Sequence, residues 1–418
     1  MALSGLTIDH TRIQEELDRL AEYSSVPAPA VGRVMLSDAD MAARDYLKSL
    51  FTGAGLQLRT DPAGNVFARW SGVESNLPAV ATGSHTDAIP HSGKYDGTVG
   101  VLGGLEAIRS LLRSGFQPRR SIELLMFTSE EPTRYGVGCL GSRVLSGALE
   151  PSRADALSDE TNNSFAELRQ RRGFFGSLSE VPLAKGYYRA FVELHTEQGP
   201  LLERTGLPIG VVTAIAAPAA IRVTYTGEGG HAGAVLMPDR RDALLPAAEL
   251  ALEVDRAART SGSPDTVATL GLLQVHPGAV NCIASRTYME IDVRDVQLGR
   301  RDQVLGHIEE LAVQIGARRN VEASVERINA DPPAQCDPLI VSTIEAACHD
   351  AGLQSQRMIS RAYHDSLFMA LVCPIGMIFI PCRGGVSHRP DEYASPKAIG
   401  AGVEVLARTL ARLSEVDE

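Results

Sequence analysis

Short apolar segments alternate with amphipathic segments over the first two hundred residues of the chain. Apolar side chains recur at helical spacing in three segments: 13–20, 41–50 and 101–112. Apolar runs that predict buried strands lie at 79–84, 121–128 and 191–194, and 56–70 predicts two strands around a turn. Buried strands that alternate with helices are typical of an α/β domain with a central, mostly parallel sheet.

The pattern changes near residue 210 and returns near residue 329. Between these points, strand-like segments and two long amphipathic helices follow the order β-β-α-β-β-α-β, which is close to a split βαβ sandwich. Beyond them, a helix near 344–351 and a strand at 375–380 continue the first domain. The expected organisation is therefore a first domain made of residues 1–209 and 329–418, with an inserted α+β sandwich domain at 210–328.

Composition and charge exclude several classes of partner. The chain has 418 residues and a formal net charge of −11, which disfavours binding to nucleic acid or to an anionic membrane. The longest apolar run, 367–382, is interrupted by prolines and is too short to span a bilayer, so it predicts a buried strand and turn. Six cysteines without a CxxC pair, together with an N-terminus that lacks a signal-peptide pattern, predict reduced thiols in a cytoplasmic protein.

Five side chains that can bind metal follow predicted strands or lie in tight turns: His85, Asp96, Glu131, His195 and His388. Each of these side chains lies in a cluster of polar residues. Sites in open α/β sheets form beyond the carboxyl ends of the strands, and the clusters with His85, Glu131 and His195 lie there. Each cluster also has an ordinary structural explanation, because isolated histidines are often buried without function and adjacent carboxylates are usually solvated. Together, three histidines and two carboxylates suit divalent ions such as Zn²⁺ or Mn²⁺.

The same strings supply groups that could assist catalysis. A metal-bound histidine needs a partner for its second ring nitrogen, and the carboxylate of Asp87 suits His85. If Asp96 bridged two metals, each metal would receive one end of Asp96 and two further ligands, leaving room for an activated water. Of the adjacent glutamates, Glu131 would be the ligand and Glu130 the general base that takes a proton from this water.

Five strings together resemble the dinuclear aminoacylase-like peptidase superfamily over nearly the whole chain: GSHTD with KYDG, SEEPTRYG, ELHTEQGP, GEGGHAG and GVSHRP. They look most like its hydantoinase/carbamoylase branch, which includes N-carbamoyl-amino-acid hydrolases, β-ureidopropionase, and allantoate and ureidoglycolate amidohydrolases. Peptidases of the superfamily tend to have a carboxylate where this chain has His195, whereas the ureido branch has histidine. The resemblance implies one metal on His85, Asp96 and His195, and another on Asp96, Glu131 and His388.

The resemblance also implies a role for the second domain. This domain is similar to the family's lid and dimerisation domain, which implies a homodimer in which it places residues in the partner subunit's site. His231 would stabilise the oxyanion of the tetrahedral intermediate, and Asn281 and Arg294 would hold the substrate carboxylate, a task suited to the arginine fork. Gln198 would contact the ureido group. Without the resemblance, GGHAG predicts a plain turn and Arg294 a surface ion pair.

Two departures from the carbamoylase pattern concern the substrate, a small ureido acid. The paired glutamates are followed by Pro132-Thr133-Arg134, and a later string is Ala362-Tyr363-His364-Asp365-Ser366. Both resemble ureidoglycolate amidohydrolases. Tyr363 is a candidate hydrogen-bond donor to the substrate, with a buried aromatic ring as the alternative. The sequence thus favours hydrolysis of ureidoglycolate to glyoxylate, ammonia and carbon dioxide. Allantoate, N-carbamoyl-L-amino acids and a non-catalytic small-molecule binder stay as alternatives.

Overall fold

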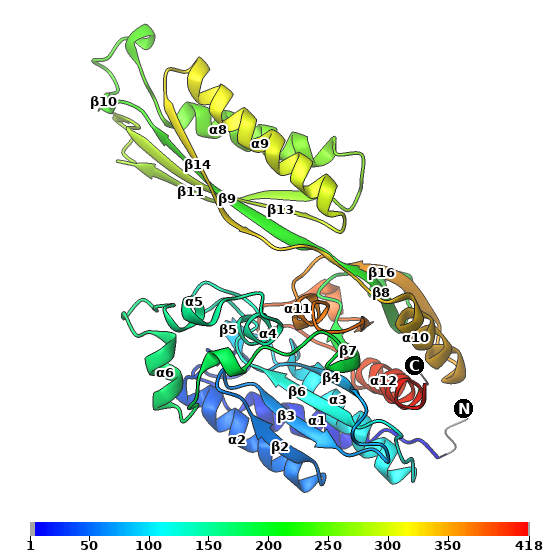
Figure 1. Ribbon diagram of the computed structural model, residues 1–418. Coiled ribbons are helices and arrows are strands. Elements are labelled where there is room, and N and C mark those ends of the chain that lie inside the picture. The colour runs from blue at the N-terminus through cyan, green and yellow to red at the C-terminus, as the bar shows by residue number, and fades with distance from the viewer. Residues whose placement is uncertain (1–4, 417–418) are drawn as a thin grey trace. The chain divides into compact units, whose positions relative to one another are not determined.

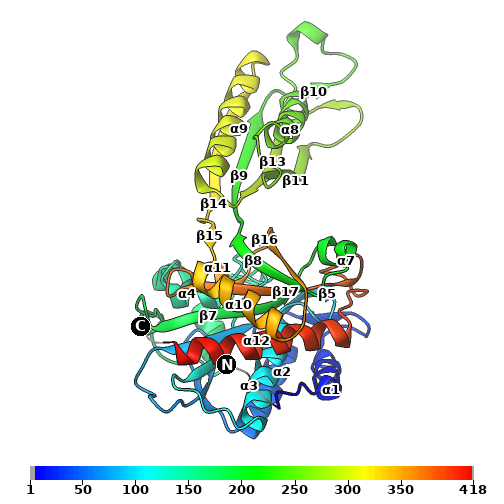
Figure 2. The ribbon, with the colours of Figure 1, turned by 90° about the vertical axis from the view of Figure 1, so that its right-hand side faces the viewer.

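The computed structural model describes residues 5–416, which form two compact units (Figure 1, Figure 2). The first unit runs to Thr213 and resumes at Gln335, and the second unit comprises Ala214–Ala334. The second unit is therefore an insertion, and the first unit is built from segments on both sides of it.

A nine-stranded mixed sheet forms the centre of the first unit. The strand order is β15-β8-β17-β7-β4-β6-β3-β2, and β16 pairs with β8. Strands β17, β7, β4 and β6 are parallel, whereas β8 pairs antiparallel with β17, β3 with β6 and β2 with β3. The predicted α/β class is confirmed, but the sheet is mixed rather than mostly parallel. The turn between β2 and β3 is one reason, because two strands joined by a short turn can only be antiparallel.

The strands of the first unit fall into the central sheet and one small pair. The central strands are β2 (Gln57–Thr60), β3 (Val66–Trp70), β4 (Ala79–His85), β6 (Ile122–Phe127), β7 (Tyr188–Thr196), β8 (Ile209–Ile215), β15 (Ala334–Gln335), β16 (Ser355–Ser360) and β17 (Ile375–Ile380). The separate pair is β1 (Val31–Arg33) with β5 (Ala88–Ser92). Every residue of β4, β6 and β17 is buried, as expected for parallel strands covered on both faces.

Helices of the first unit pack around this sheet. They are α1 (His10–Ala21), α2 (Asp38–Gly53), α3 (Thr98–Arg113), α4 (Leu140–Ser146), α5 (Pro151–Asp155), α6 (Phe165–Arg171), α7 (Leu201–Thr205), α10 (Pro338–Asp350), α11 (Asp365–Met369) and α12 (Pro396–Glu415). Helices α3 and α12 contact each other and strands β4 and β7. Gly100 of α3 and Gly402 of α12 approach Leu194 so closely that a Cβ on either would overlap it. These contacts fix the main chain of β7 one residue before His195.

The second unit is an α+β sandwich. Its antiparallel sheet has the order β11-β13-β9-β14, and helices α8 and α9 pack against it (Figure 1). The elements are β9 (Ala217–Thr226), β10 (Gly230–His231), α8 (Leu244–Arg259), β11 (Val267–His276), β12 (Cys282–Ile283), β13 (Arg286–Asp295), α9 (Leu298–Arg318) and β14 (Glu322–Ala330). Buried and half-buried residues alternate along β13, and its buried Met289, Ile291 and Val293 join the core formed with the two helices. This alternation is the pattern of a sheet with one covered face.

Several elements of the first unit were not predicted from the sequence, and two segments show why. The C-terminal helix α12 was not predicted, although Ser395 caps it and Pro396 occupies its first turn. The run 367–382 is only partly the predicted strand and turn, because α11 ends at Met369 before β17 begins. A mostly apolar run of this kind has no periodicity that separates helix from strand. Within residues 5–416, no helix combines the length and apolarity needed to cross a membrane.

Candidate metal centre

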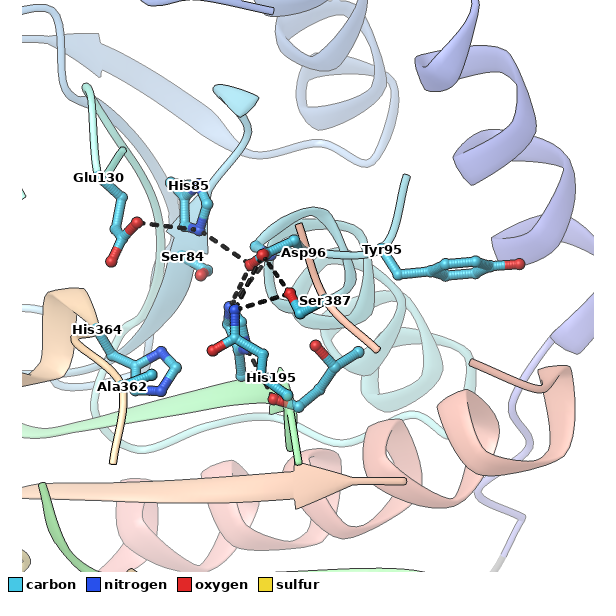
Figure 3. A network of polar contacts seen from close by, with 12 residues as sticks. Ser84, His85, Tyr95, Asp96, Glu130, His195, Ala362, His364 and Ser387 are labelled. Atoms are coloured by element: carbon cyan, nitrogen blue, oxygen red, sulfur yellow. Dashed lines mark hydrogen bonds and ion pairs between the residues drawn. The ribbon is translucent and has the colours of Figure 1, made fainter. Parts of the chain in front are cut away.

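Five predicted ligand residues converge at one edge of the central sheet, as Figure 3 shows for three of them. His85 is the last residue of β4, and His195 is the next-to-last residue of β7. Asp96 lies in the loop before α3, while Glu131 follows β6 and His388 follows β17. The carboxyl ends of parallel strands meet at one edge, where sites in α/β sheets form. The fold therefore brings together residues that are up to 303 positions apart in the sequence, from His85 to His388.

The carboxylate of Asp96 lies between two groups of ligand atoms. Its Oδ1 is 3.2 Å from Nε2 of His195 and 3.6 Å from Nε2 of His85. Its Oδ2 is 3.1 Å from Nε2 of His388, and that nitrogen is 3.3 Å from Oε1 of Glu131. Within each group the possible ligand atoms lie within 4.8 Å of one another. Asp96 thus offers one oxygen to each group.

Main-chain carbonyls set the orientation of two histidines. Nδ1 of His85 is 3.1 Å from the carbonyl of Asp87, and Nδ1 of His195 is 2.9 Å from that of Thr196. A proton on each Nδ1 leaves Nε2 with a lone pair for a cation. The Asp87 carboxylate was expected to orient His85, but it is 3.7 Å from Nδ1 and instead accepts hydrogen bonds from the N–H groups of Glu130 and Glu131, both at 3.1 Å. Asp87 therefore fixes the two glutamates.

The chemistry of this donor set fits divalent cations. Oε1 of Glu131 is buried and accepts no hydrogen bond from the described residues, and a buried anionic oxygen is costly unless a cation compensates it. Imidazole nitrogens and carboxylate oxygens are the ligands that Zn²⁺ and Mn²⁺ prefer. A further group of close donors, Glu193 with His195 and His364, fits less well. The carboxylate of Glu193 already accepts hydrogen bonds from Ser84 and Ser366.

Burial and neighbouring charge set the protonation of these groups. Burial works against ionisation of Asp96, but the neighbouring rings of His195, His388 and His85 lower the pKa of Asp96 well below its ordinary value. The carboxylate of Asp96, and after it that of Glu131, lies beside the His388 ring and raises the pKa of His388 to about 11. Burial raises the pKa of Glu130 well above its ordinary value, although His85 opposes this effect. Asp96 is therefore held as an anion, which suits a ligand, whereas Glu130 is shifted towards the pKa of a proton acceptor that works near neutrality.

The carboxylate of Glu130 lies beside the donor set (Figure 3). Its Oε2 is 3.7 Å from Nε2 of His85, and its Oε1 accepts a hydrogen bond from Sγ of Cys139 at 3.5 Å. The side chain of Glu130 is 12% exposed, so its carboxylate is largely removed from bulk water without being sealed off. A molecule bound at the donor set would therefore lie within reach of this carboxylate.

Several side chains that surround the ligands were not predicted from sequence. The carboxylate of Glu392 accepts hydrogen bonds from the main chain next to Asp96, and Ser387 contacts the Asp96 carboxylate. The buried ring of His364 lies 4.5 Å from that of His195. The string GVSHRPDE contains Ser387 and Glu392, but adjacent acidic residues in a Pro- and Gly-rich loop usually indicate solvated surface. No local signal distinguished these residues.

Two predicted substrate-binding residues also belong to the first unit. Gln198 has a left-handed φ of 55°, and its Nε2 donates to Oδ2 of Asp96 at 2.9 Å. The half-buried ring of Tyr363 stacks on Phe368 with 6.4 Å between ring centres, and the guanidinium of Arg143 lies 5.9 Å from it. Gln198 is therefore at the donor set, and Tyr363 is held by an aromatic and cationic cluster.

The other predicted residues lie in the second unit. His231 and Asn281 line a cavity of about 370 Å³ at the β10–β12 pair. The N–H of Gly233 donates to Nδ1 of His231 at 3.1 Å, which assigns the ring proton to Nε2 and makes that atom a donor. Arg294 on β13 pairs with Asp292 at 2.7 Å, so the predicted surface ion pair exists. That pairing is compatible with a second role, because a guanidinium has five N–H donors.

Comparisons with known proteins agree on one family. Residues 81–412 match the family described as Peptidase family M20/M25/M40. The chain is 53% identical to the ureidoglycolate hydrolase of Arabidopsis thaliana, with 98% of this chain and 88% of the relative covered. It is 35% identical to the N-carbamoyl-L-amino acid amidohydrolase of Geobacillus stearothermophilus, with 98% and 99% covered. The crystal structure of AtUAH in complex with (S)-hydroxyglycine superposes with a TM-score of 0.89 at 52% identity, covering 99% of this chain and 100% of that one.

Proposed function

The chain belongs to peptidase family M20/M25/M40, and from this premise we propose that it is a metal-dependent amidohydrolase that acts on ureidoglycolate. The observation that carries the metal-dependent chemistry is the position of Asp96, whose two oxygens face two separate groups of ligand atoms. The similarity of the whole chain to a ureidoglycolate hydrolase supports the choice of substrate.

Two divalent cations, Mn²⁺ or Zn²⁺, fit the donor set. One would be held by His85, Asp96 and His195, and the other by Asp96, Glu131 and His388. Such ions would lower the pKa of a water between them and polarise the ureido carbonyl. The protein's part is to hold the imidazole Nε2 atoms and the carboxylates in place, which the carbonyls of Asp87 and Thr196 do for two of the histidines.

Glu130 is the proposed general base. Its carboxylate would take a proton from the attacking water and pass it to the leaving nitrogen as the C–N bond breaks. Overall, one ureidoglycolate and one water give one glyoxylate, one carbon dioxide and two ammonia molecules. The main chain of Glu130 is fixed by Asp87, so its carboxylate is positioned before the substrate binds.

The remaining predicted residues bind the substrate. Gln198 would contact the ureido group, and Tyr363 would donate a hydrogen bond to the substrate hydroxyl or carbonyl. The second unit would act as a lid and dimerisation domain in a homodimer. From it, His231 would stabilise the oxyanion in the partner subunit's site, and Asn281 with Arg294 would bind the substrate carboxylate. We also propose a cytoplasmic location, which agrees with six cysteines that form no disulfide.

Allantoate and N-carbamoyl-L-amino acids are the alternative substrates, because they would undergo the same chemistry in a different pocket. Identity to the ureidoglycolate hydrolase is higher than to the carbamoyl-amino-acid enzyme, which favours ureidoglycolate. A non-catalytic binder is disfavoured, because Glu130 and all five ligand residues are retained.

A substrate panel tests the proposal. The full chain, loaded with Mn²⁺ or with Zn²⁺, is incubated with ureidoglycolate, allantoate, N-carbamoyl-L-amino acids and a dipeptide. Ammonia and glyoxylate are then measured. We expect both products from ureidoglycolate, in a ratio of two to one, and turnover of ureidoglycolate above that of the others. If another ureido acid were turned over faster, that compound would replace ureidoglycolate as the assigned substrate. If no compound released ammonia or glyoxylate, the proposed amidohydrolase activity would be refuted.

A further inference from the structure

The carboxylate of Glu392 is buried between two loops of the metal centre. One loop precedes α3 and carries Asp96, and the other precedes α12 and carries Ser387 and His388. Oε2 of Glu392 accepts hydrogen bonds from the N–H groups of Tyr95 at 3.0 Å and Asp96 at 3.3 Å, and Oε1 lies 3.2 Å from the hydroxyl of Ser387. Glu392 is 5% exposed. One side chain therefore connects the loop of the shared carboxylate to the loop of His388.

The sequence leaves space for this carboxylate. A Cβ at Gly93 would overlap Cβ and Oε2 of Glu392, so the absence of a side chain at position 93 allows Glu392 to reach the N–H groups behind Asp96. On its own loop, the N–H of Glu392 donates to the carbonyl of Arg389 at 3.1 Å. One loop therefore provides the space for the Glu392 side chain, and the other loop fixes the Glu392 main chain.

Ser387 extends the connection to the Asp96 side chain. Its hydroxyl is 2.9 Å from Oδ2 of Asp96 as well as 3.2 Å from Oε1 of Glu392. A hydroxyl has one proton and donates to one of these oxygens at a time. When Oδ2 of Asp96 serves as a ligand, Glu392 remains available as the acceptor for Ser387.

We propose that Glu392 is a positioning residue that sets the affinity of the metal centre by fixing Asp96 and His388 relative to each other. The inference rests on the proposed function, because it requires that the centre binds metal. Glu392 is not itself a member of the groups that could hold a metal, since its oxygens face N–H and O–H donors. Side chains that hydrogen-bond to the ligand loops in this way orient the ligands. Their loss typically weakens metal affinity by roughly 10- to 100-fold.

The substitution Glu392→Gln tests this role at constant size. Two of the three groups that face the carboxylate are N–H donors, and the third is the Ser387 hydroxyl. The NH₂ of glutamine must therefore either oppose the two N–H groups or face Ser387, where it offers no acceptor and leaves the Ser387 proton to Oδ2 of Asp96. The full chain is stripped with a chelator and titrated with Mn²⁺, and free Mn²⁺ is measured by electron paramagnetic resonance. We expect Glu392→Gln to weaken binding of at least one Mn²⁺ by roughly 10- to 100-fold. Ser387→Ala and Gly93→Ala should weaken it in the same direction, and they serve as the test if Glu392→Gln does not fold.

Glu106→Gln is the matched control. Glu106 of α3 is fully buried and binds the N–H of Asp9 and the guanidinium of Arg12, and it contacts none of the five ligand residues. Its substitution should lower the melting temperature of the metal-free protein and leave Mn²⁺ affinity unchanged. Wild-type Mn²⁺ affinity in the folded Glu392 and Ser387 variants would refute this inference alone. A wild-type chain that binds neither Mn²⁺ nor Zn²⁺ would refute the proposed function and this inference together.

Discussion

The thiol of Cys139 donates a hydrogen bond to the carboxylate of Glu130, with 3.5 Å between Sγ and Oε1. The main chains of the two residues are also joined, because the N–H of Cys139 donates to the carbonyl of Glu130 at 2.7 Å. Cys139 is fully buried and has a left-handed φ of 54°. Among the described residues, this thiol is the hydrogen-bond donor to the Glu130 carboxylate, so it restricts the orientation of the proposed general base.

Replacement of Cys139 should therefore reduce turnover more than substrate binding. Cys139→Ala removes the donor, and we expect kcat for ureidoglycolate to fall by roughly two- to tenfold, the range for one weak hydrogen bond, with little change in KM. Cys139→Ser keeps a donor and should retain most of kcat. Steady-state kinetics of both variants measure this. Equal kcat in the alanine, serine and wild-type proteins would show that the thiol does not influence Glu130.

Glu130→Gln should separate metal binding from catalysis. Glutamine cannot accept a proton from water, but it adds no bulk, and Asp87 still holds the main chain. We expect kcat to fall by at least about 10²-fold, the lower end for loss of a general base, while Mn²⁺ content per chain stays unchanged. Kinetics together with metal analysis of the same sample measure this. Retained turnover in a metal-loaded variant would refute the assignment of the base.

Arg294→Ala should mainly weaken substrate binding. If its guanidinium binds the substrate carboxylate, loss of a charge-assisted hydrogen bond should raise KM by roughly 10- to 100-fold with a smaller effect on kcat. Asp292→Asn is the control, because it removes the acidic partner of Arg294 and leaves the guanidinium in place. An unchanged KM in the alanine variant would refute a role for Arg294 in substrate binding. The ion pair with Asp292 would then be its assigned role.

Metal removal should destabilise the first unit. Five ionisable residues that are the proposed ligands share a small space, and a cation that binds only the folded chain would stabilise it by mass action. At a free Mn²⁺ concentration 100 times the dissociation constant, the gain is about 2.7 kcal/mol. Thermal unfolding in chelator and in increasing Mn²⁺ should therefore show a rising melting temperature. His85→Ala should reduce this rise, and a melting temperature that is independent of Mn²⁺ would argue against a bound cation.

Asp61 should make stability depend on pH between about pH 4 and pH 6. Burial raises the pKa of Asp61 to about 6, although the N–H groups of Ala63 and Asn65 oppose this effect. Because the folded-state pKa is raised, the contribution is fully present below the unfolded pKa near 3.8 and is lost as the pH rises through 6. The shift of about two units corresponds to at most about 3 kcal/mol.

Asp61→Asn isolates this contribution. The melting temperatures of the metal-free variant and wild type, measured from pH 4 to pH 7, should differ by an amount that changes across this interval, with the wild type favoured more at pH 4 than at pH 7. A constant difference would show that Asp61 does not titrate in this range.

Several features of the protein follow from local sequence. Helices α1, α2 and α3 and the buried strands β4, β6 and β7 were predicted, because apolar periodicity and continuous apolar runs are set by which side chains must be buried. The α+β character of the second unit followed from the same patterns. The candidate ligands were found because strand ends in α/β sheets are where sites form. The antiparallel pairing of β8 with β17 and of β3 with β6 was not predicted, since it depends on strands that are distant in sequence.

Tertiary structure decided the arrangement around the ligands. Asp87 was expected to orient His85, yet the folded chain turns its carboxylate to the N–H groups of Glu130 and Glu131, 43 and 44 positions away. Glu392 meets the N–H of Asp96 across 296 positions. Residue types and spacing identify which groups can bind a metal, because those properties belong to each side chain. Which donor reaches which acceptor depends on loops that only the folded chain brings together, and the sequence has no periodicity that records such contacts.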